Sequence, residues 1–227
     1  MDKQYPTGKE LVSVVLCTYN GANFLAAQID SLLRQTYAPL EIIISDDAST
    51  DGTLAILQSF ENHPGFHIFY QPKNIGYAQN FAFALQRATG EYIALCDQDD
   101  VWLPHKVETL LHCMSGQWLA YSDSLLVDAA GNSMHKKLSD LRNMRSGRDT
   151  HGFFLFNVVW GHALMIHRNL LPASLPIPDG IPHDIWLAYK ASTLTGLNYC
   201  PAALTHYRQH QSAVTQTLLP KNIPTRT

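Results

Sequence analysis

The sequence contains 227 residues, of which 46% are hydrophobic and 15% charged, a composition typical of one folded globular domain and not of disordered, collagen-like or coiled-coil chains. The formal net charge is −3 and no run of basic residues supplies the stripe that phosphate backbones require, so nucleic acid is not an expected partner. No apolar run reaches the roughly 18 residues of a membrane span, and Met1–Glu10 is too polar for a signal peptide, so we expect a cytoplasmic protein that is able to contact the inner face of the cytoplasmic membrane.

The first half of the chain alternates between short apolar runs and segments with helical spacing of apolar residues. The runs typical of buried strands lie at 12–17, 40–45, 67–70 and 92–96. Asn23 is the expected N-cap of a first helix that ends near Gln35, and further helices follow the second and third strands. Gly90 is expected to close the third helix as its C-terminal glycine.

The second half of the chain is less regular. A helix is predicted at 104–113, a strand at 118–127, a long polar loop at 133–149, a return to the sheet at 163–167 and a helix at 185–192. Residues from Leu218 onward are expected to form a loose tail. Strands that alternate with amphipathic helices predict an α/β fold, with a doubly wound, mostly parallel sheet and helices on both faces, in a single domain.

The cysteines show no pattern that indicates metal binding. Cys17, Cys96, Cys113 and Cys200 are far apart and none forms a CxxC or Cys/His spacing. We therefore expect four reduced residues, and this usage is typical of a reducing compartment.

Polar clusters follow three of the predicted strands, at the point where each strand ends. Residues 18–20 (TYN) follow the first strand, the pair 46–47 follows the second and the DQDD run at 97–100 follows the fourth. In a doubly wound sheet the carboxyl ends of parallel strands lie at one edge, where ligands bind. We therefore expect these three clusters to meet.

The DQDD run places three carboxylates in four positions, and they repel one another unless a cation or hydrogen-bond donors neutralise them. A hard divalent cation such as Mg²⁺ or Mn²⁺ takes carboxylate oxygens together with substrate phosphate oxygens. A solvated acidic turn that caps the next helix is an equally good interpretation of this run by itself. For the Asp46-Asp47 pair alone, a purely structural turn is the stronger interpretation.

Three segments carry a resemblance to a known family. VSVVLCTYNG at 12–21, LEIIISDDASTDGT at 40–53 and NIGYAQNFAFALQRATGEYIALCDQDDVWLP at 74–104 resemble the family 2 glycosyltransferases, which are inverting enzymes with the GT-A fold. The likeness is dense from Val12 to about His112 and extends more thinly to His210. CDQDDVWLP, HDIWLA and YRQH most resemble the rhamnosyltransferase-like bacterial branch that builds surface polysaccharide.

The resemblance implies roles for particular residues. The donor nucleotide would be bound by Thr18, Tyr19, Asp47, Asn80 and Asp97. Mn²⁺ or Mg²⁺ would be held by Asp99, with Asp100 and His210 as further candidate ligands. For each of these residues a capping or loop-ordering role is the alternative, and for the histidines near the end of the chain it is the first choice.

The resemblance also implies a catalytic base and an acceptor side. Asp184, in the HDIWLA segment, would take the proton of the acceptor hydroxyl; Asp179 is the nearest rival, and an N-cap role is the alternative for Asp184. Gly161-His162 replaces the Gly-Cys or Gly-Ala pair of many relatives, which leaves the acceptor contacts open. Arg208 is a candidate partner of phosphate.

Together these features predict an enzyme that moves a sugar from a UDP- or dTDP-sugar to a hydroxyl of a saccharide or lipid-linked acceptor. The predicted division of the chain is an N-terminal extension (1–10), a GT-A domain (11–215) with a nucleotide-binding half (11–113) and an acceptor-binding half (114–215), and a C-terminal tail (216–227). A sugar-nucleotide pyrophosphorylase is disfavoured because no Gly-rich phosphate loop follows the first strand. A non-catalytic nucleotide-sugar-binding module or degenerate partner subunit remains the alternative.

Overall fold

The computed structural model describes residues 10–155 and 158–210, so the predicted tail and most of the predicted N-terminal extension lie outside the described residues. The described part contains nine strands: β1 (Val12–Thr18), β2 (Leu40–Asp46), β3 (Phe66–Tyr70), β4 (Tyr92–Cys96), β5 (Val101–Trp102), β6 (Leu119–Val127), β7 (Ser133–Lys137), β8 (Leu164–His167) and β9 (Asn198–Arg208). Its α-helices are α1 (Leu25–Leu33), α2 (Thr53–Gln58), α3 (Tyr77–Leu85), α4 (Lys106–Met114), α5 (Thr150–Leu155), α6 (Leu171–Ser174) and α7 (His183–Leu194).

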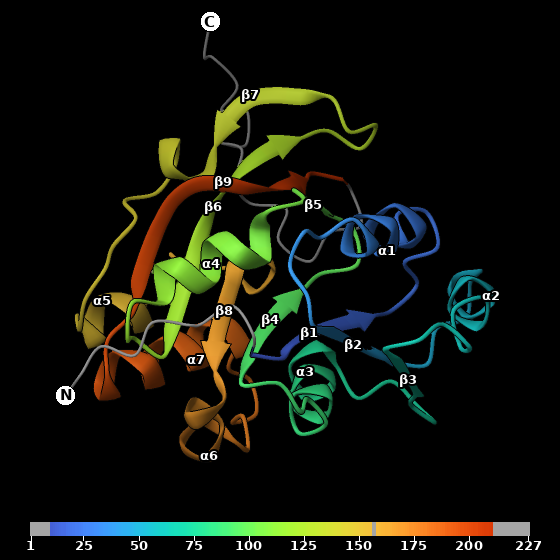
Figure 1. Ribbon diagram of the computed structural model, residues 1–227, viewed down its shortest axis with the longest axis horizontal. Helices are drawn as coiled ribbons and strands as arrows, with labels where there is room; N and C mark the ends of the chain where they lie inside the picture. Colours follow the sequence, from blue (N-terminus) through green and yellow to red (C-terminus); the bar gives the residue numbers. More distant parts are fainter. Residues whose placement is uncertain (1–9, 156–157, 211–227) are drawn as a thin grey trace, which may run out of the picture.

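All of these strands belong to one sheet, in the order β3-β2-β1-β4-β8-β6-β9-β5, with β7 paired to β6 (Figure 1). β3, β2, β1 and β4 are parallel to one another, as the βα alternation predicts. β8 runs antiparallel to both β4 and β6, and β9 runs parallel to β6. The α/β fold with helices on both faces of a single sheet is confirmed.

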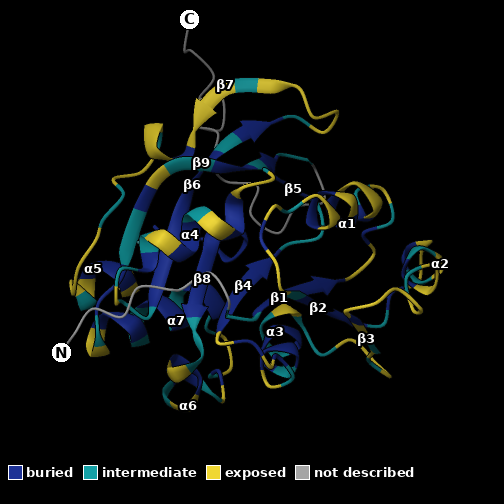
Figure 2. Cartoon of the chain, viewed as in Figure 1, coloured by how far each residue is buried: buried dark blue, intermediate teal, exposed yellow. Residues whose placement is uncertain are grey.

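Each face of the sheet has its own hydrophobic core, because successive strand side chains point to opposite faces. Val14 and Leu16 of β1 pack in the core covered by α1, α2 and α4. Val15 and Cys17, from the alternate positions of the same strand, pack in the core covered by α3, α5, α6 and α7. The central strands β1, β2 and β4 are therefore buried on both sides, as the buried colouring of the central sheet in Figure 2 shows.

Two strands of the second half were not predicted. Residues 133–137 lie in the segment predicted as a long loop, but they form β7 and pair with β6, with Val127 opposite Ser133. This strand is almost entirely exposed, so it has no apolar alternation that a sequence pattern could reveal. β9 contains Pro201 and its register with β6 shifts beside Ser122 and Asp123, which hides the strand in the sequence.

Two local predictions were wrong. Asn23 is not the N-cap of α1, because the helix begins at Leu25, Phe24 occupies the cap position and no side chain caps it. The Gly21 carbonyl accepts the backbone N–H groups of Phe24 and Leu25 instead. Gly90 does not close α3, which ends at Leu85. It lies where β1 approaches so closely that a Cβ would come within 2.6 Å of the Leu11 carbonyl oxygen and the Ser13 nitrogen.

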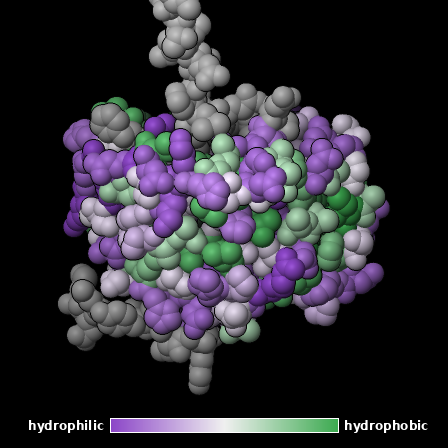
Figure 3. Space-filling model, turned by 90° about the horizontal axis from the view of Figure 1, so that it is seen from above, coloured by the Kyte–Doolittle hydropathy of each residue, from purple (hydrophilic) through white to green (hydrophobic). Residues whose placement is uncertain are grey.

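The four cysteines are free thiols, and Cys17, Cys96 and Cys200 are buried, as expected. No helix of the described residues has the length and apolarity needed to cross a membrane. Seen from above, the surface carries hydrophobic patches between hydrophilic side chains (Figure 3).

Replacing Gly90 with alanine should lower the stability of the protein. The added Cβ meets backbone atoms, which cannot rotate away, so we expect a cost of about 1–3 kcal/mol. For a domain of this size that corresponds to a fall in Tm of roughly 2–4 °C per kcal/mol. Gly52→Ala is the matched control, since its Cβ would meet only the Ala22 side chain at 3.4 Å. Equal thermal unfolding of the two variants, measured by circular dichroism, would contradict this account.

Candidate active site

The carboxyl ends of β1, β2 and β4 bring the three predicted polar clusters together. β1 lies between β2 and β4, and the Asp47 backbone N–H donates to the Thr18 carbonyl at 2.8 Å. The pKa of the Cys17 thiol is raised, first by burial and then by the negative charges of Asp97 and Asp47. Carboxylates that follow different strands therefore act on one thiol at the end of β1.

Asp46 and Asp47 have different structural roles. Asp46 is fully buried and accepts hydrogen bonds from the hydroxyls of Thr18 at 2.8 Å and Ser49 at 2.6 Å, so it orders the turn after β2. Asp47 is 2% exposed and accepts the backbone N–H groups of Ile75 at 2.7 Å and Gly76 at 3.0 Å. The Asp47 carboxylate thereby ties the loop before α3 to the end of β2.

The other residues predicted to bind a nucleotide occupy contrasting positions. Asn80 is 1% exposed; its amide donates to the Ser45 carbonyl at 2.8 Å and accepts the Ser45 hydroxyl at 2.6 Å. Tyr19 is 47% exposed, and the side-chain amide of Gln98 pairs with its backbone N–H at 2.9 Å and its carbonyl at 3.0 Å. Gln98 therefore joins the loop after β1 to the DQDD loop, a contact that was not predicted.

The predicted base, Asp184, lies near this edge of the sheet, and we call the residues 18–20, 46–47, 97–100 and Asp184 the rim. The pKa of Asp97 rises to about 7, chiefly because of burial and then because of the negative charges of Asp99 and Asp184, against the opposing charge of Lys106. Asp184 lies in the first turn of α7 and accepts the Ile185 backbone N–H at 2.8 Å, while Pro182 holds the N-cap position. The structure thus brings Asp184 into the electrostatic neighbourhood of Asp97, whereas Asp179 is exposed and bonds to Gln79 at 3.1 Å.

The DQDD segment at 97–100, here called the acidic loop, has an outer and an inner set of contacts. On the outer side, Oδ2 of Asp99 lies 2.8 Å from Nε2 of His210, and these side chains are 19% and 10% exposed. The His210 ring packs on Phe24 with 4.7 Å between centroids. Asp99 and His210, which were both candidate metal ligands, are therefore in direct contact.

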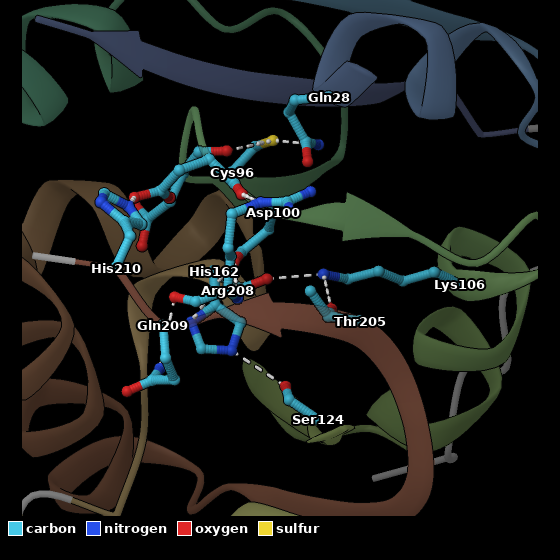
Figure 4. Close-up of polar contacts among 12 residues, drawn as sticks. Gln28, Cys96, Asp100, Lys106, Ser124, His162, Thr205, Arg208, Gln209 and His210 are labelled. Carbon is cyan, nitrogen blue, oxygen red and sulfur yellow. Dashed lines mark hydrogen bonds and ion pairs between the residues drawn. The ribbon is translucent and has the colours of Figure 1, made fainter. Parts of the chain in front are cut away.

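On the inner side, Asp100 is fully buried. Figure 4 shows the polar contacts around it. Its Oδ1 accepts the Arg208 backbone N–H at 2.9 Å, and its Oδ2 has no hydrogen-bond partner within the described residues. Nδ1 of His162 lies 3.8 Å from that oxygen, and Nε2 of His162 pairs with the Ser124 hydroxyl at 2.9 Å. Burial, with a smaller contribution from Lys106, holds the pKa of His162 well below its usual value, so the ring is neutral.

The donor set fits a hard divalent cation. Asp97, Asp100 and His162 each present one ligand atom, and these atoms all lie within 4.8 Å of one another. Carboxylate oxygens and a neutral imidazole are ligands that Mn²⁺ accepts. The orphaned oxygen of Asp100 and the raised pKa of Asp97 are both signs of negative charge that the described residues do not fully compensate.

Several participants were missed or misplaced by sequence reasoning. Lys106 is fully buried and donates to the Thr205 hydroxyl at 2.8 Å and to the His162 carbonyl. Its burial lowers its pKa to about 7. Lys106 is the first residue of an ordinary amphipathic helix, so no sequence pattern indicates this role. His162, expected on the acceptor side, lies behind the acidic loop instead.

Arg208 was a candidate partner of phosphate, but its guanidinium is bonded to backbone carbonyls of the protein. Its side chain is 8% exposed, and its guanidinium donates to the Asp99 carbonyl at 2.8 Å and to the Ala129 carbonyl at 2.9 Å. The same guanidinium lies 4.9 Å above the Phe24 ring. Arg208 therefore fastens the acidic loop to β9.

His183, next to Asp184, is an unusual buried histidine. It is 5% exposed, stacks on Phe81 with 3.9 Å between centroids, and neither ring nitrogen has a hydrogen-bond partner within the described residues. A Cβ on Gly161 would come within 2.7 Å of Nε2, so this position leaves room for the imidazole. Burial lowers the pKa of His183 to about 3.

Comparison with known proteins gives one family match. The family described as "Glycosyl transferase family 2" matches residues 13–172. The putative teichuronic acid biosynthesis glycosyltransferase TuaG of Bacillus subtilis is 40% identical over 115 residues, which are 50% of this chain and 46% of TuaG. The Escherichia coli UDP-Glc:alpha-D-GlcNAc-diphosphoundecaprenol beta-1,3-glucosyltransferase WfgD is 28% identical over 208 residues, 90% of this chain and 79% of WfgD.

A solved structure supports the fold. The mannosyltransferase PcManGT of Pyrobaculum calidifontis, in complex with GDP-Man and Mn²⁺, superposes with a TM-score of 0.64 over 87% of this chain and 56% of that one, at 23% identity. The chain thus spans about half the length of TuaG and of PcManGT. The likeness to PcManGT establishes the GT-A architecture.

The buried ring of His183 should make the protein lose stability in mild acid. His183 binds a proton near pH 6.5 in the unfolded chain but only near pH 3 in the folded one. The stability that the neutral ring contributes is therefore complete above pH 6.5 and is lost as the pH falls toward 3. At pH 5 the loss amounts to about 2 kcal/mol. The free energy of unfolding, measured with urea, should change between pH 7.5 and pH 5 by that much less in His183→Phe than in the wild type. His63→Phe, at an exposed position, is the control and should keep the wild-type difference. An unchanged pH dependence in His183→Phe would refute the assignment.

Proposed function

Because the chain belongs to glycosyl transferase family 2, we propose that it transfers a sugar from a nucleoside-diphosphate donor to a hydroxyl of a saccharide or lipid-linked acceptor, with inversion at the anomeric carbon. The observation that carries this proposal is that Asp184, in the first turn of α7, shares an electrostatic neighbourhood with Asp97 and Asp99 in the loop after β4. Such a rim offers a cation site and a proton acceptor side by side, which are the two groups that glycosyl transfer from a diphosphate requires.

The donor in this proposal is a UDP- or dTDP-sugar carrying a hexosyl or rhamnosyl group. The similarity to WfgD, a UDP-Glc-dependent enzyme whose acceptor is a diphosphoundecaprenol-linked GlcNAc, supports both a uridine nucleotide and a lipid-linked acceptor. The teichuronic acid assignment of TuaG supports a role in building bacterial surface polysaccharide. We place the reaction at the cytoplasmic face of the cell membrane.

The nucleotide would lie against the ends of β1 and β2. The exposed ring of Tyr19 would contact the base, and Asp47 would reach it with the lone pairs that Ile75 and Gly76 do not use. Thr18 and Asn80 are buried, so they would act by holding the ends of β1 and β2 in place.

The acidic loop would hold the metal ion. Asp97, Asp99, Asp100, His162 and His210 are the candidate ligands, in the inner and outer sets described above. When bound there, Mn²⁺ or Mg²⁺ supplies positive charge that stabilises the departing nucleoside diphosphate. Arg208 keeps the loop in position through the Asp99 carbonyl.

Asp184 would act as the general base. An acceptor hydroxyl is a weak nucleophile, and the Asp184 carboxylate would take its proton as the new C–O bond forms at the anomeric carbon. The bond to the diphosphate oxygen breaks on the opposite face, so the anomeric configuration inverts. The position of Asp184 in the first turn of a twelve-residue helix fixes its backbone to a rigid element.

The alternative function is a non-catalytic module that binds nucleotide sugars or supports a partner subunit. Both functions predict nucleotide binding, but only the enzyme predicts turnover that needs Asp184 and a metal ion. Donor turnover is therefore the measurement that separates them.

Replacing Asp184 with asparagine should lower kcat by about 10³-fold, because the amide cannot accept the proton. Binding of UDP with Mn²⁺, measured by calorimetry, should stay within about twofold of the wild type. Asp179→Asn, at the rival position, is the matched control and should retain turnover. If Asp184→Asn turns over normally, Asp184 is not the base.

Replacing Asp99 with alanine should abolish the Mn²⁺-dependent release of nucleoside diphosphate from a UDP-sugar in the absence of acceptor. The variant loses a candidate ligand and the partner of His210, so we expect the apparent affinity for Mn²⁺ to fall by at least tenfold. Asp30→Ala, on the exposed Asp30–Arg34 pair of α1, controls for the loss of one surface carboxylate. Release that is independent of Mn²⁺ in the wild type would count against the metal site.

A further inference from the structure

Three large hydrophobic side chains lie exposed on α5 and at the end of α7. Leu155 is 68% exposed, Phe154 41% and Leu194 39%. They account for three of the seven exposed large hydrophobic residues in the part of the chain that the structure describes. Single exposed hydrophobic residues are ordinary, but a cluster on two packed helices indicates a contact surface.

Aromatic side chains join α5 to α7. The Phe154 ring lies 5.3 Å from the Tyr189 ring, and Tyr189 lies 5.6 Å from Trp186. Trp186, Lys190 and Leu194 are spaced four residues apart, so they share one side of α7. The hydrophobic cluster therefore continues along the helix toward its N-terminus, which carries Asp184.

Basic groups flank this surface. The Lys190 ammonium lies 4.8 Å above the Trp186 ring. The Arg148 guanidinium donates to the Thr193 carbonyl at 3.0 Å and to the Leu194 carbonyl at 2.7 Å, at the C-terminal end of α7. Neither cation has a carboxylate partner among the described salt bridges, unlike Arg145, which pairs with Asp149 at 2.8 Å.

We propose that this surface docks on an anionic phospholipid bilayer. The α5–α7 face is defined by Arg148, Phe154, Leu155, Trp186, Lys190 and Leu194. Leu and Phe side chains enter the boundary between headgroups and acyl chains, while lysine and arginine bind anionic headgroups. The indole N–H of Trp186 donates to the Ser174 carbonyl at 2.7 Å, so this half-buried ring offers an apolar surface, with Lys190 beside it for anionic headgroups.

This proposal rests on the proposed function and adds to it how a lipid-linked acceptor would reach Asp184. Asp184 and Leu194 lie at opposite ends of α7, and ten residues at a rise of 1.5 Å separate them by about 15 Å along the helix. A bilayer at the Leu194 end thus lies within the reach of a diphosphate-linked saccharide whose hydroxyl approaches Asp184. The α5–α7 face would bring the active site to a lipid-anchored acceptor.

The test is co-sedimentation of the full chain with vesicles of phosphatidylcholine alone and of phosphatidylcholine with phosphatidylglycerol at about 3:1. We expect binding to the anionic vesicles that weakens as salt rises, since a Debye length of about 10 Å at 0.1 M screens these contacts. Leu155→Ser should lower the partition coefficient by roughly tenfold. Lys190→Gln should lower it on anionic vesicles only. Leu33→Ser, at a residue 43% exposed on α1, is the matched control and should bind like the wild type.

Two outcomes overturn the proposal. One is equal binding of Leu155→Ser, Leu33→Ser and the wild type. The other is a change in oligomeric mass by light scattering that depends on Leu155 without any vesicle binding, because it assigns the face to a second copy of the chain. Leu155 is so exposed that its replacement should leave folding intact, which the Tm checks.

Donor hydrolysis without vesicles separates this proposal from the proposed function. Leu155→Ser should hydrolyse a UDP-sugar with Mn²⁺ at the wild-type rate, since the residue has no place in the rim. Hydrolysis without vesicle binding refutes the docking face alone. Vesicle binding without any hydrolysis or transfer refutes the proposed function and, with it, the acceptor side of this inference.

Discussion

The concentration of negative charge at the end of β4 is the constraint on which the site depends. Asp97, Asp99 and Asp100 follow one strand directly, and the charge of Asp184 adds to theirs, so burial and repulsion raise the pKa of Asp97 to about 7. The fold opposes this charge from behind with a buried lysine, Lys106. The cost of burying that cation is visible in its own pKa, which falls to about 7. Burial therefore disfavours the charged forms of both Asp97 and Lys106. A divalent cation bound beside the carboxylates would favour their charged forms.

The acidic loop owes its shape to a strand far away in the sequence. β5, which follows the loop at once, pairs with β9 through Val101–His206 and Trp102–Thr205. Arg208, at the end of β9, then bonds to Asp99 and Asp100, and His210 contacts Asp99. The loop is thus closed on one side by its own strand and on the other by β9. This long-range pairing joins the two halves of the chain at the residues that carry the chemistry.

Sequence reasoning recovered the parts of this arrangement that local patterns encode. The apolar runs of β1, β2 and β4 are typical of strands buried on both faces, and the polar residues that follow these strands lie at one edge, as predicted. It did not find β7, whose side chains face solvent, or β9, which a proline and register shifts interrupt. His162 and Lys106 were also missed, because their roles arise from strands and helices that meet only in three dimensions. The roles of Asp99 and His210 as metal ligands remain predictions, although their contact is now direct.

Helix α7 connects the chemistry of the rim to the surface of the molecule. Its first turn carries Asp184, and its buried side packs through Leu187, Ala188 and Ala191. Its outer side carries the half-buried Trp186 and Lys190 and the exposed Leu194. Because α7 is one continuous helix, the position of its outer side fixes the position of its first turn. If a bilayer binds that side, the orientation of Asp184 toward an acceptor is set by the membrane rather than by a protein pocket alone. The lipid anchor would then confine the acceptor to the plane in which α7 is held.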